Sequence, residues 1–137
     1  RGINGIFDAN SGEWVYGDKQ DSTIGYLDNT VFTHYGSMVE WLLYSPFMRL
    51  ERMSINELEV ETIPGHTISE DAEVAISLTY NGLTYGKEWF EMYGEPLDYG
   101  KRFIIRQLGY IDDYVGIKLR GASTSRMSFA DIRLTYD

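Results

Sequence analysis

Apolar and polar residues alternate along much of the chain with a period of two, the period of a β-strand that has one buried and one exposed face. The alternation is clearest in three stretches, at 74–80, 115–120 and 130–136. In the first, Val74, Ile76, Leu78 and Tyr80 fall on one face. Strands of this kind build an antiparallel sheet with one face on a core and one in water.

Short candidate strands recur along the whole chain, with turn-forming residues between them. They are Glu13–Gly17, Thr23–Leu27, Met38–Tyr44, Ile55–Thr62, Val74–Tyr80, Leu83–Tyr85, Trp89–Tyr93, Phe103–Leu108, Val115–Arg120 and Met127–Tyr136. Residues 47–53 are compatible with one helical turn or with a strand and a bend, and no helix of three turns is predicted. The spacing predicts an all-β sandwich or barrel. The alternation of buried and exposed faces favours an antiparallel, jelly-roll-like β-sandwich.

The stretch ISLTYNGLTYGKEWF at 76–90 predicts a hairpin. Asn81-Gly82 between two β-rich runs is the signal for a tight two-residue turn, in which both residues take positive φ angles. The hairpin either contributes Val74, Ile76, Leu78 and Tyr80 to the sandwich core or presents an aromatic platform to a sugar.

The first 33 residues differ from the rest, because they offer only a lone hairpin at 13–27. A two-stranded hairpin is marginally stable in water. We therefore expect it to lean on the sandwich or on preceding sequence, with a boundary near 29–34. The chain begins at Arg1 without a methionine, which indicates a piece of a longer protein.

Composition narrows the class of protein. The 137 residues fit one domain with a small appendage, and the absence of cysteine excludes disulfides and thiolate metal sites. A net charge of −9 disfavours binding to nucleic acid and to anionic membranes. We expect no signal peptide, and no apolar run approaches the roughly 20 residues of a membrane helix.

The sequence offers little enzyme chemistry. His34 and His66 lie far apart and in no metal-ligand spacing, and no nucleophile, phosphate-loop or zinc-protease motif occurs. Glu57, Glu59 and Glu61 alternate on one strand. Such a row is more often a solvated face, or a guard against edge pairing, than a glycosidase pair. We predict no enzyme activity and no cofactor.

Acidic residues near the start are the only calcium candidates. Asp8, Asn10 and Glu13 in FDANSGEW resemble a calcium loop, but Gly12 stands where that loop needs an oxygen ligand. We expect a turn stabilised by Asx side chains instead, and no metal site. Asp18, Asp21 and Asp28 are spread in a similar way.

Aromatic residues make up 15% of the chain. A sugar-stacking platform would use Trp14, Trp41, Trp89, Tyr80, Tyr85, Tyr93 and Tyr99, although most strand aromatics pack in cores. Basic residues concentrate toward the C-terminus, at Arg102, Arg106, Arg120, Arg126 and Arg133. They are read either as scattered surface arginines or as an interface rim.

Several stretches together resemble the packaged-DNA stabilisation proteins of short-tailed bacteriophages, the tail hub or nozzle proteins built onto the portal. These stretches are ISLTYNGLTYGKEWF, GEPLDYGKRFIIRQLGYIDDYVGIKLRG, ADIRLTYD, YGDKQDSTIGYLDNTVFTHYG and LLYSPFMRLERMSINELEVET. They cover almost the whole chain in order. Each alone is a weak signal, because none carries a catalytic signature.

The resemblance implies a division of the chain. Residues 1–33 would be the closing strands of the last blade of a β-propeller, and residues 34–137 a C-terminal β-sandwich. The full protein would form a homo-oligomeric ring that extends the portal channel, retains packaged DNA, and contacts the portal adaptor, the tail spike and the needle-like plug. It would be made in the bacterial host cytoplasm and reside in the virion tail.

One departure from the family lies in the region Arg106–Lys118, where related chains tend to be more basic and this chain has Ile111-Asp112-Asp113-Tyr114. We therefore expect no specific nucleic acid binding here, although an acidic wall suits a conduit through which DNA slides. For partner contacts we predict Trp89, Phe90, Arg102 and Arg106. The alternative function is a carbohydrate-binding β-sandwich for host-surface recognition, which requires aromatic side chains exposed on one concave face.

Overall fold

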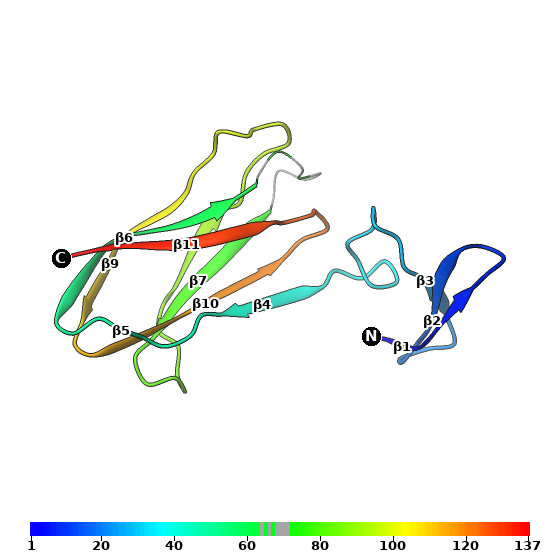
Figure 1. The fold of residues 1–137 in the computed structure, drawn as a ribbon, viewed down its shortest axis with the longest axis horizontal. Coiled ribbons are helices and arrows are strands. Elements are labelled where there is room, and N and C mark those ends of the chain that lie inside the picture. The colour runs from blue at the N-terminus through cyan, green and yellow to red at the C-terminus, as the bar shows by residue number, and fades with distance from the viewer. Residues whose placement is uncertain (64, 66, 68–71) are drawn as a thin grey trace. The chain divides into compact units, whose positions relative to one another are not determined.

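A computed structural model describes residues 1–63, 65, 67 and 72–137. In that part of the chain all regular secondary structure is β-strand. It divides into two compact units, Arg1–Val39 and Glu40–Asp137, and each is considered by itself (Figure 1). The all-β, antiparallel prediction is confirmed. No described segment forms a helix with the length and hydropathy needed to cross a membrane.

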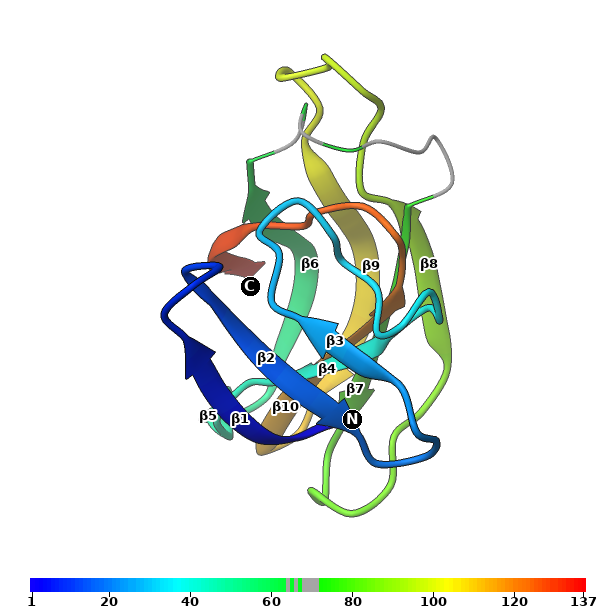
Figure 2. The ribbon, with the colours of Figure 1, turned by 90° about the vertical axis from the view of Figure 1, so that its right-hand side faces the viewer.

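The first unit is an antiparallel meander of three strands. Its strands are β1 (Gly2–Asp8), β2 (Glu13–Asp18) and β3 (Ile24–Tyr26), in the order β1-β2-β3 (Figure 2). The second and third are the predicted hairpin, while the first was not predicted. A β-bulge interrupts the β1–β2 pairing between Ile3 and Ile6.

The second unit is a β-sandwich of two sheets. One sheet has the order β4-β10-β7-β8 and consists of β4 (Glu40–Tyr44), β10 (Tyr114–Ala122), β7 (Glu73–Thr79) and β8 (Glu88–Met92), with β5 (Met48–Arg49) also pairing to β10. The other has the order β11-β6-β9 and consists of β11 (Phe129–Tyr136), β6 (Met53–Thr62) and β9 (Phe103–Ile111). All pairs are antiparallel.

The core lies between the two sheets. Its fully buried side chains come from both, and among the largest are Tyr93, Phe103, Ile55, Leu58, Ile76, Leu78, Ile111, Ile117 and Leu119. Ile132 and Leu134 of β11 are partly buried against it. Burial of apolar surface on both inner faces is what holds such a sandwich together.

The central strand β7 departs from the predicted pattern, because both of its faces are covered. Ala75 and Ser77 lie on the outer face, yet they are 4% and 0% exposed. The ion pair between Arg120 of β10 and Glu88 of β8 spans β7, which separates those strands in the sheet. Small side chains on β7 leave room for this bridge.

The turn after β7 differs from the one that the sequence predicted. The strand ends at Thr79, Tyr80 is 54% exposed rather than in the core, and Leu83–Tyr85 is not a strand. Of the Asn81-Gly82 pair only Gly82 has a positive φ, of 74°. The hairpin β7–β8 exists, but a longer loop joins its strands.

Asn81 organises this loop with its side chain. Its Oδ1 accepts hydrogen bonds from the backbone N–H groups of Leu83 and Thr84, both at 2.9 Å. Side-chain oxygens of this kind mimic a backbone turn, so the Asn-Gly signal here marks an Asx turn instead of a two-residue hairpin.

Candidate partner interface

Trp89 and Phe90 are neighbours on β8, at the edge of the five-stranded sheet, and point to opposite faces. Trp89 pairs with Ile76 and packs, partly buried, against the core. Phe90 pairs with Ala75 and is 54% exposed on the outer face. Of these two residues, only Phe90 therefore presents a large apolar side chain to a partner.

The outer face around Phe90 carries charges that are already paired. Arg120 donates to both carboxylate oxygens of Glu88, at 3.1 and 2.8 Å. This bidentate contact with Arg120 lowers the pKa of Glu88 below its ordinary value. The Lys118 ammonium lies 4.6 Å from the centroid of the Tyr85 ring. The face is thus a mixed aromatic and charged surface.

Arg106 lies on β9 of the other sheet, and Arg102 directly precedes that strand; both pair with glutamates of β6. Arg106 Nε lies 3.0 Å from Glu57, and Arg102 Nε lies 2.8 Å from Glu59. On the far side of β6, Arg133 of β11 lies 2.7 Å from Glu61. We call these three pairs, Glu57–Arg106, Glu59–Arg102 and Glu61–Arg133, the ion-pair ladder.

The ladder accounts for the alternating glutamates, which form a solvated, cross-strand charged face. The hydrogen bond from Arg102, followed by the charges of Arg102 and Arg133, lowers the pKa of Glu59. The four predicted contact residues consequently fall on different surfaces, Phe90 on the outer face of one sheet and Arg106 on that of the other. Their role in binding partners stays a prediction.

The aromatic residues proposed for sugar stacking do not gather on one face. Tyr93 is 0% exposed, and Trp41 and Trp89 pack against the core. The Trp41 ring contacts Phe129 at a centroid distance of 5.1 Å. Trp14 belongs to the first unit, where it contacts Phe7. This weakens the carbohydrate-binding alternative as far as it depends on these residues.

The carboxylates of the first unit stabilise turns. Asp8 accepts from Asn10 N at 3.1 Å and from Ser11 Oγ at 2.8 Å, as expected for an Asx turn. Asp18 is buried and receives Arg1 Nε at 2.8 Å, and this contact holds the pKa of Asp18 well below its ordinary range.

The remaining candidates for chemistry do not form a site in the described residues. His34 bridges to Ser37 through backbone atoms, and His66 lies outside the described residues. Across 1–63, 65, 67 and 72–137, no group of three acidic or histidine side chains is placed to hold a metal ion.

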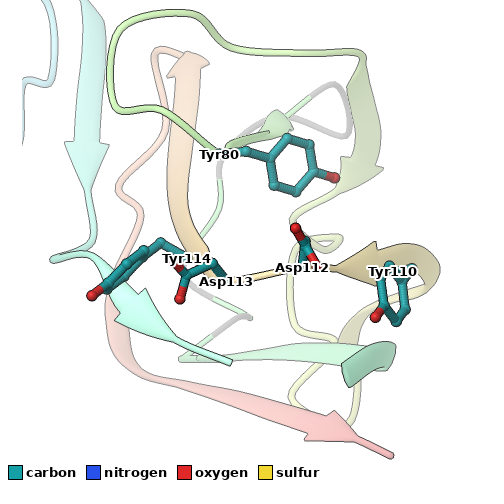
Figure 3. Close-up of a pocket in the computed structure, with 5 residues that line it drawn as sticks. All are labelled: Tyr80, Tyr110, Asp112, Asp113 and Tyr114. Atoms are coloured by element: carbon teal, nitrogen blue, oxygen red, sulfur yellow. The ribbon is translucent and has the colours of Figure 1, made fainter. Parts of the chain in front are cut away.

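A pocket that sequence reasoning missed lies at the end of the sandwich where the β7–β8 loop meets the β9–β10 hairpin. It has a volume of about 300 Å³ and is lined by Tyr80, Tyr110, Asp112, Asp113 and Tyr114. In Figure 3 the Asp112 carboxylate points toward the Tyr80 side of the pocket. The signal in the sequence was the acidic turn flanked by tyrosines at 110–114.

Two of the residues that line this pocket, Asp113 and Tyr114, already contact the side chain of Arg49. The Arg49 guanidinium lies 5.8 Å from the centroid of the Tyr114 ring, and its Nε lies 3.5 Å from Asp113. The Phe47 ring also contacts Tyr114, at a centroid distance of 6.2 Å. Tyr80 and Tyr110 are more than half exposed.

The first unit has an apolar surface without a core of its own. Residues 1–39 are all described, and none of their apolar side chains is buried. Instead, the following large apolar side chains are exposed: Ile3, Ile6, Phe7, Trp14, Ile24, Tyr26, Leu27, Val31 and Met38. Residues 1–39 therefore expose many large apolar side chains and bury none of them.

Comparison with known proteins identifies relatives. Residues 40–137 match the family model described as the β-sandwich of bacteriophage P22 Gp10, and this range coincides with the second unit. Over 137 residues the chain is 28% identical to the tail hub protein gp10 of Salmonella phage P22. All of the chain is aligned, and it spans 28% of the length of that relative.

Proposed function

Because the chain belongs to the family of the bacteriophage P22 Gp10 β-sandwich, we propose that it is the C-terminal region of a phage tail hub protein, a structural part of the virion tail. The observation that carries the proposal is the alignment of all 137 residues of this chain with part of a tail hub protein. The buried apolar core of the described residues lies within 40–137, which supports it.

The surface supports a structural role better than a catalytic one. Most charges that sequence reasoning singled out are held in ion pairs, as in the ion-pair ladder and the Arg120–Glu88 bridge. A general acid or base needs a displaced pKa and reach to a substrate. Among the described carboxylates with a lowered pKa, Asp18, Glu59 and Glu88 are instead held by arginines. Asp8 and Asp28 are held by hydrogen bonds within their own turns. We propose that the chain has no enzyme activity.

Within the tail, we propose that the full protein forms a ring that extends the portal channel and helps retain packaged DNA. Its partners would be the portal adaptor, the tail spike and the tail needle. The chain carries a net charge of −9, so DNA would pass it without binding. The protein would be made in the host cytoplasm and then assembled into the virion.

For the first unit we propose that its exposed apolar strands complete a β-propeller blade. The motivation is that three strands with no buried apolar side chain require packing against other chain segments. The domain division 1–33 and 34–137 remains part of this proposal.

The test uses DNA-filled phage heads that lack their own tail hub. The full-length protein containing this chain is added, and DNA that is protected from nuclease is measured. A second protein lacks 40–137, and a third carries Glu73→Gln as a matched control, because Glu73 is exposed and makes no ion pair among the described residues.

We expect the full-length and control proteins to protect the DNA and the truncated protein to fail. Equal protection by the truncated protein would show that the sandwich is dispensable for closure, and host-surface recognition, including sugar binding, would become the better account.

A further inference from the structure

Cations of this chain that lie on tyrosine rings share one arrangement. Each also has a carboxylate within reach, and the three sets are Arg1 with Tyr35 and Asp18, Arg49 with Tyr114 and Asp113, and Lys118 with Tyr85 and Glu88. A ring face attracts the cation and the carboxylate neutralises it. The chain therefore uses this combination of groups repeatedly to hold a basic side chain.

The pocket beside Arg49 has the same kinds of group, tyrosine rings and a carboxylate, among its other lining residues. Tyr80 comes from the β7–β8 loop, and Tyr110 and Asp112 come from the β9–β10 hairpin. Among the described residues no basic side chain pairs with Asp112 or lies on either ring. Arg49 is engaged at the opposite wall by Asp113, Glu51 and Tyr114.

We propose that this pocket binds an arginine side chain of a partner protein. The volume of about 300 Å³ is at the lower end for ligand pockets and suits one side chain. A planar guanidinium can stack on a tyrosine face while its N–H groups donate to the Asp112 carboxylate. Charge complementarity thus selects a basic segment, and the exposed Tyr80 and Tyr110 rings are accessible to it.

The pocket chemistry does not depend on the proposed tail function, so the two are tested separately. The probe is N-acetyl-arginine methylamide, titrated into the ¹⁵N-labelled 137-residue chain at constant ionic strength, with amide shifts as the readout. The citrulline analogue has the same shape without the charge. Methyl α-glucoside tests the sugar alternative.

Asp112→Asn removes the charge and keeps the shape of the side chain. The matched control is Glu73→Gln, which removes one exposed charge at the other end of β7. Tyr80→Leu tests the ring separately.

We expect the arginine probe to shift amides near 80–82 and 110–114 in a saturable way, and the citrulline analogue to bind at least fivefold more weakly. Asp112→Asn should weaken arginine binding about fivefold, as for a solvent-exposed ion pair, and Tyr80→Leu about two- to fivefold. Glu73→Gln should leave it unchanged.

Three results would overturn the proposal. They are equal binding of the arginine and citrulline probes, equal loss of binding in Asp112→Asn and Glu73→Gln, and shifts at these amides with the glucoside but not with arginine. The absence of any saturable shift at 80–82 and 110–114 would equally overturn it.

Discussion

The Tyr93 hydroxyl joins two segments of the sandwich at a single buried atom. It lies 3.0 Å from Ile63 O and 3.1 Å from Ser128 O, and it accepts from Ser128 N at 2.8 Å. A phenol is protonated at neutral pH at its ordinary pKa, and burial raises the pKa of Tyr93 further, so this hydroxyl is a donor. The hydroxyl anchors the chain after β6 and the chain before β11 to the same point.

Replacing this hydroxyl should cost stability. Tyr93→Phe leaves Ser128 N and a carbonyl without their partner, which should lower the free energy of unfolding by about 1–3 kcal/mol. Urea denaturation monitored by circular dichroism measures the change. Tyr136→Phe is the control, because that ring is 46% exposed, and it should change stability by less than about 0.5 kcal/mol. Equal effects of the two variants would contradict the assignment.

A second residue-scale prediction concerns Gly82, whose φ is 74°. In Gly82→Ala the new Cβ would also lie 2.9 Å from the Phe47 ring. The left-handed conformation of a non-glycine residue should lower the free energy of unfolding by about 1–3 kcal/mol.

Gly86→Ala in the same loop is its control. Gly86 has an ordinary backbone conformation, and the atom nearest its added Cβ is Leu78 O at 3.7 Å. Thermal unfolding distinguishes the two variants, and a neutral Gly82→Ala would mean that the loop adopts another turn in solution.

At this scale the sequence indicated which residues turn the chain but not how. Asn-Gly marked the position of the turn, and Gly82 does supply a positive φ. The type of turn also depends on hydrogen bonds to two threonines. Asn81 Nδ2 donates to the Thr84 hydroxyl, and Gly82 N donates to the Thr79 hydroxyl. Tyr80 was assigned to the core because the period of two was continued one residue beyond the last paired position of the strand.

At the scale of elements, the ion-pair ladder stabilises the sheet β11-β6-β9 on its outer face. The pKa of Glu59 is lowered from its ordinary value of 4.5, so its contribution to stability is complete above that pH and is lost as the pH falls through the folded-state pKa. Wild type should therefore be more stable than Glu59→Gln at pH 7, and the difference should shrink as the solution is acidified below about pH 4.5.

Urea denaturation of both proteins between pH 7 and pH 3 measures this difference. Sodium chloride at high concentration should reduce it at pH 7, because Arg102 is largely exposed and screened by salt. Glu73→Gln provides the comparison for loss of one unpaired charge. A difference between wild type and Glu59→Gln that stays constant over the whole pH range would exclude the ladder as its source.

Most strands were predictable from the sequence, and the exceptions were β1 and β5. β6, β7, β9 and β10 were predicted to within a few residues because their inner faces carry large aliphatic side chains. β1 was missed because GINGIFD has two glycines and no clean period of two. β5 has only two residues, Met48 and Arg49, and its pairing with β10 cannot be recognised from its own sequence.

At the scale of the whole molecule, the two units differ in how they can be stable. Among the residues that the structure describes, every buried apolar side chain lies in the second unit, between Ile55 and Leu119. Composition and strand spacing were enough to predict a sandwich there. The pocket and the ladder were not predictable as sites, because each joins residues from different strands, as Tyr80 and Asp112 show, and a single sequence contains no strand register.

The distribution of buried surface predicts independent behaviour of the two units when each is made alone. Residues 40–137 should fold cooperatively, with a dispersed amide spectrum and a single urea transition, because the fragment retains all the apolar residues that are buried in the described part of the chain. Residues 1–39 should be unfolded by circular dichroism, since their one buried side chain is Asp18 and three strands without a core cannot offset the chain entropy. An unfolded 40–137 fragment would mean that the sandwich needs the first unit, and a folded 1–39 fragment would remove the reason for assigning it to a larger β-propeller.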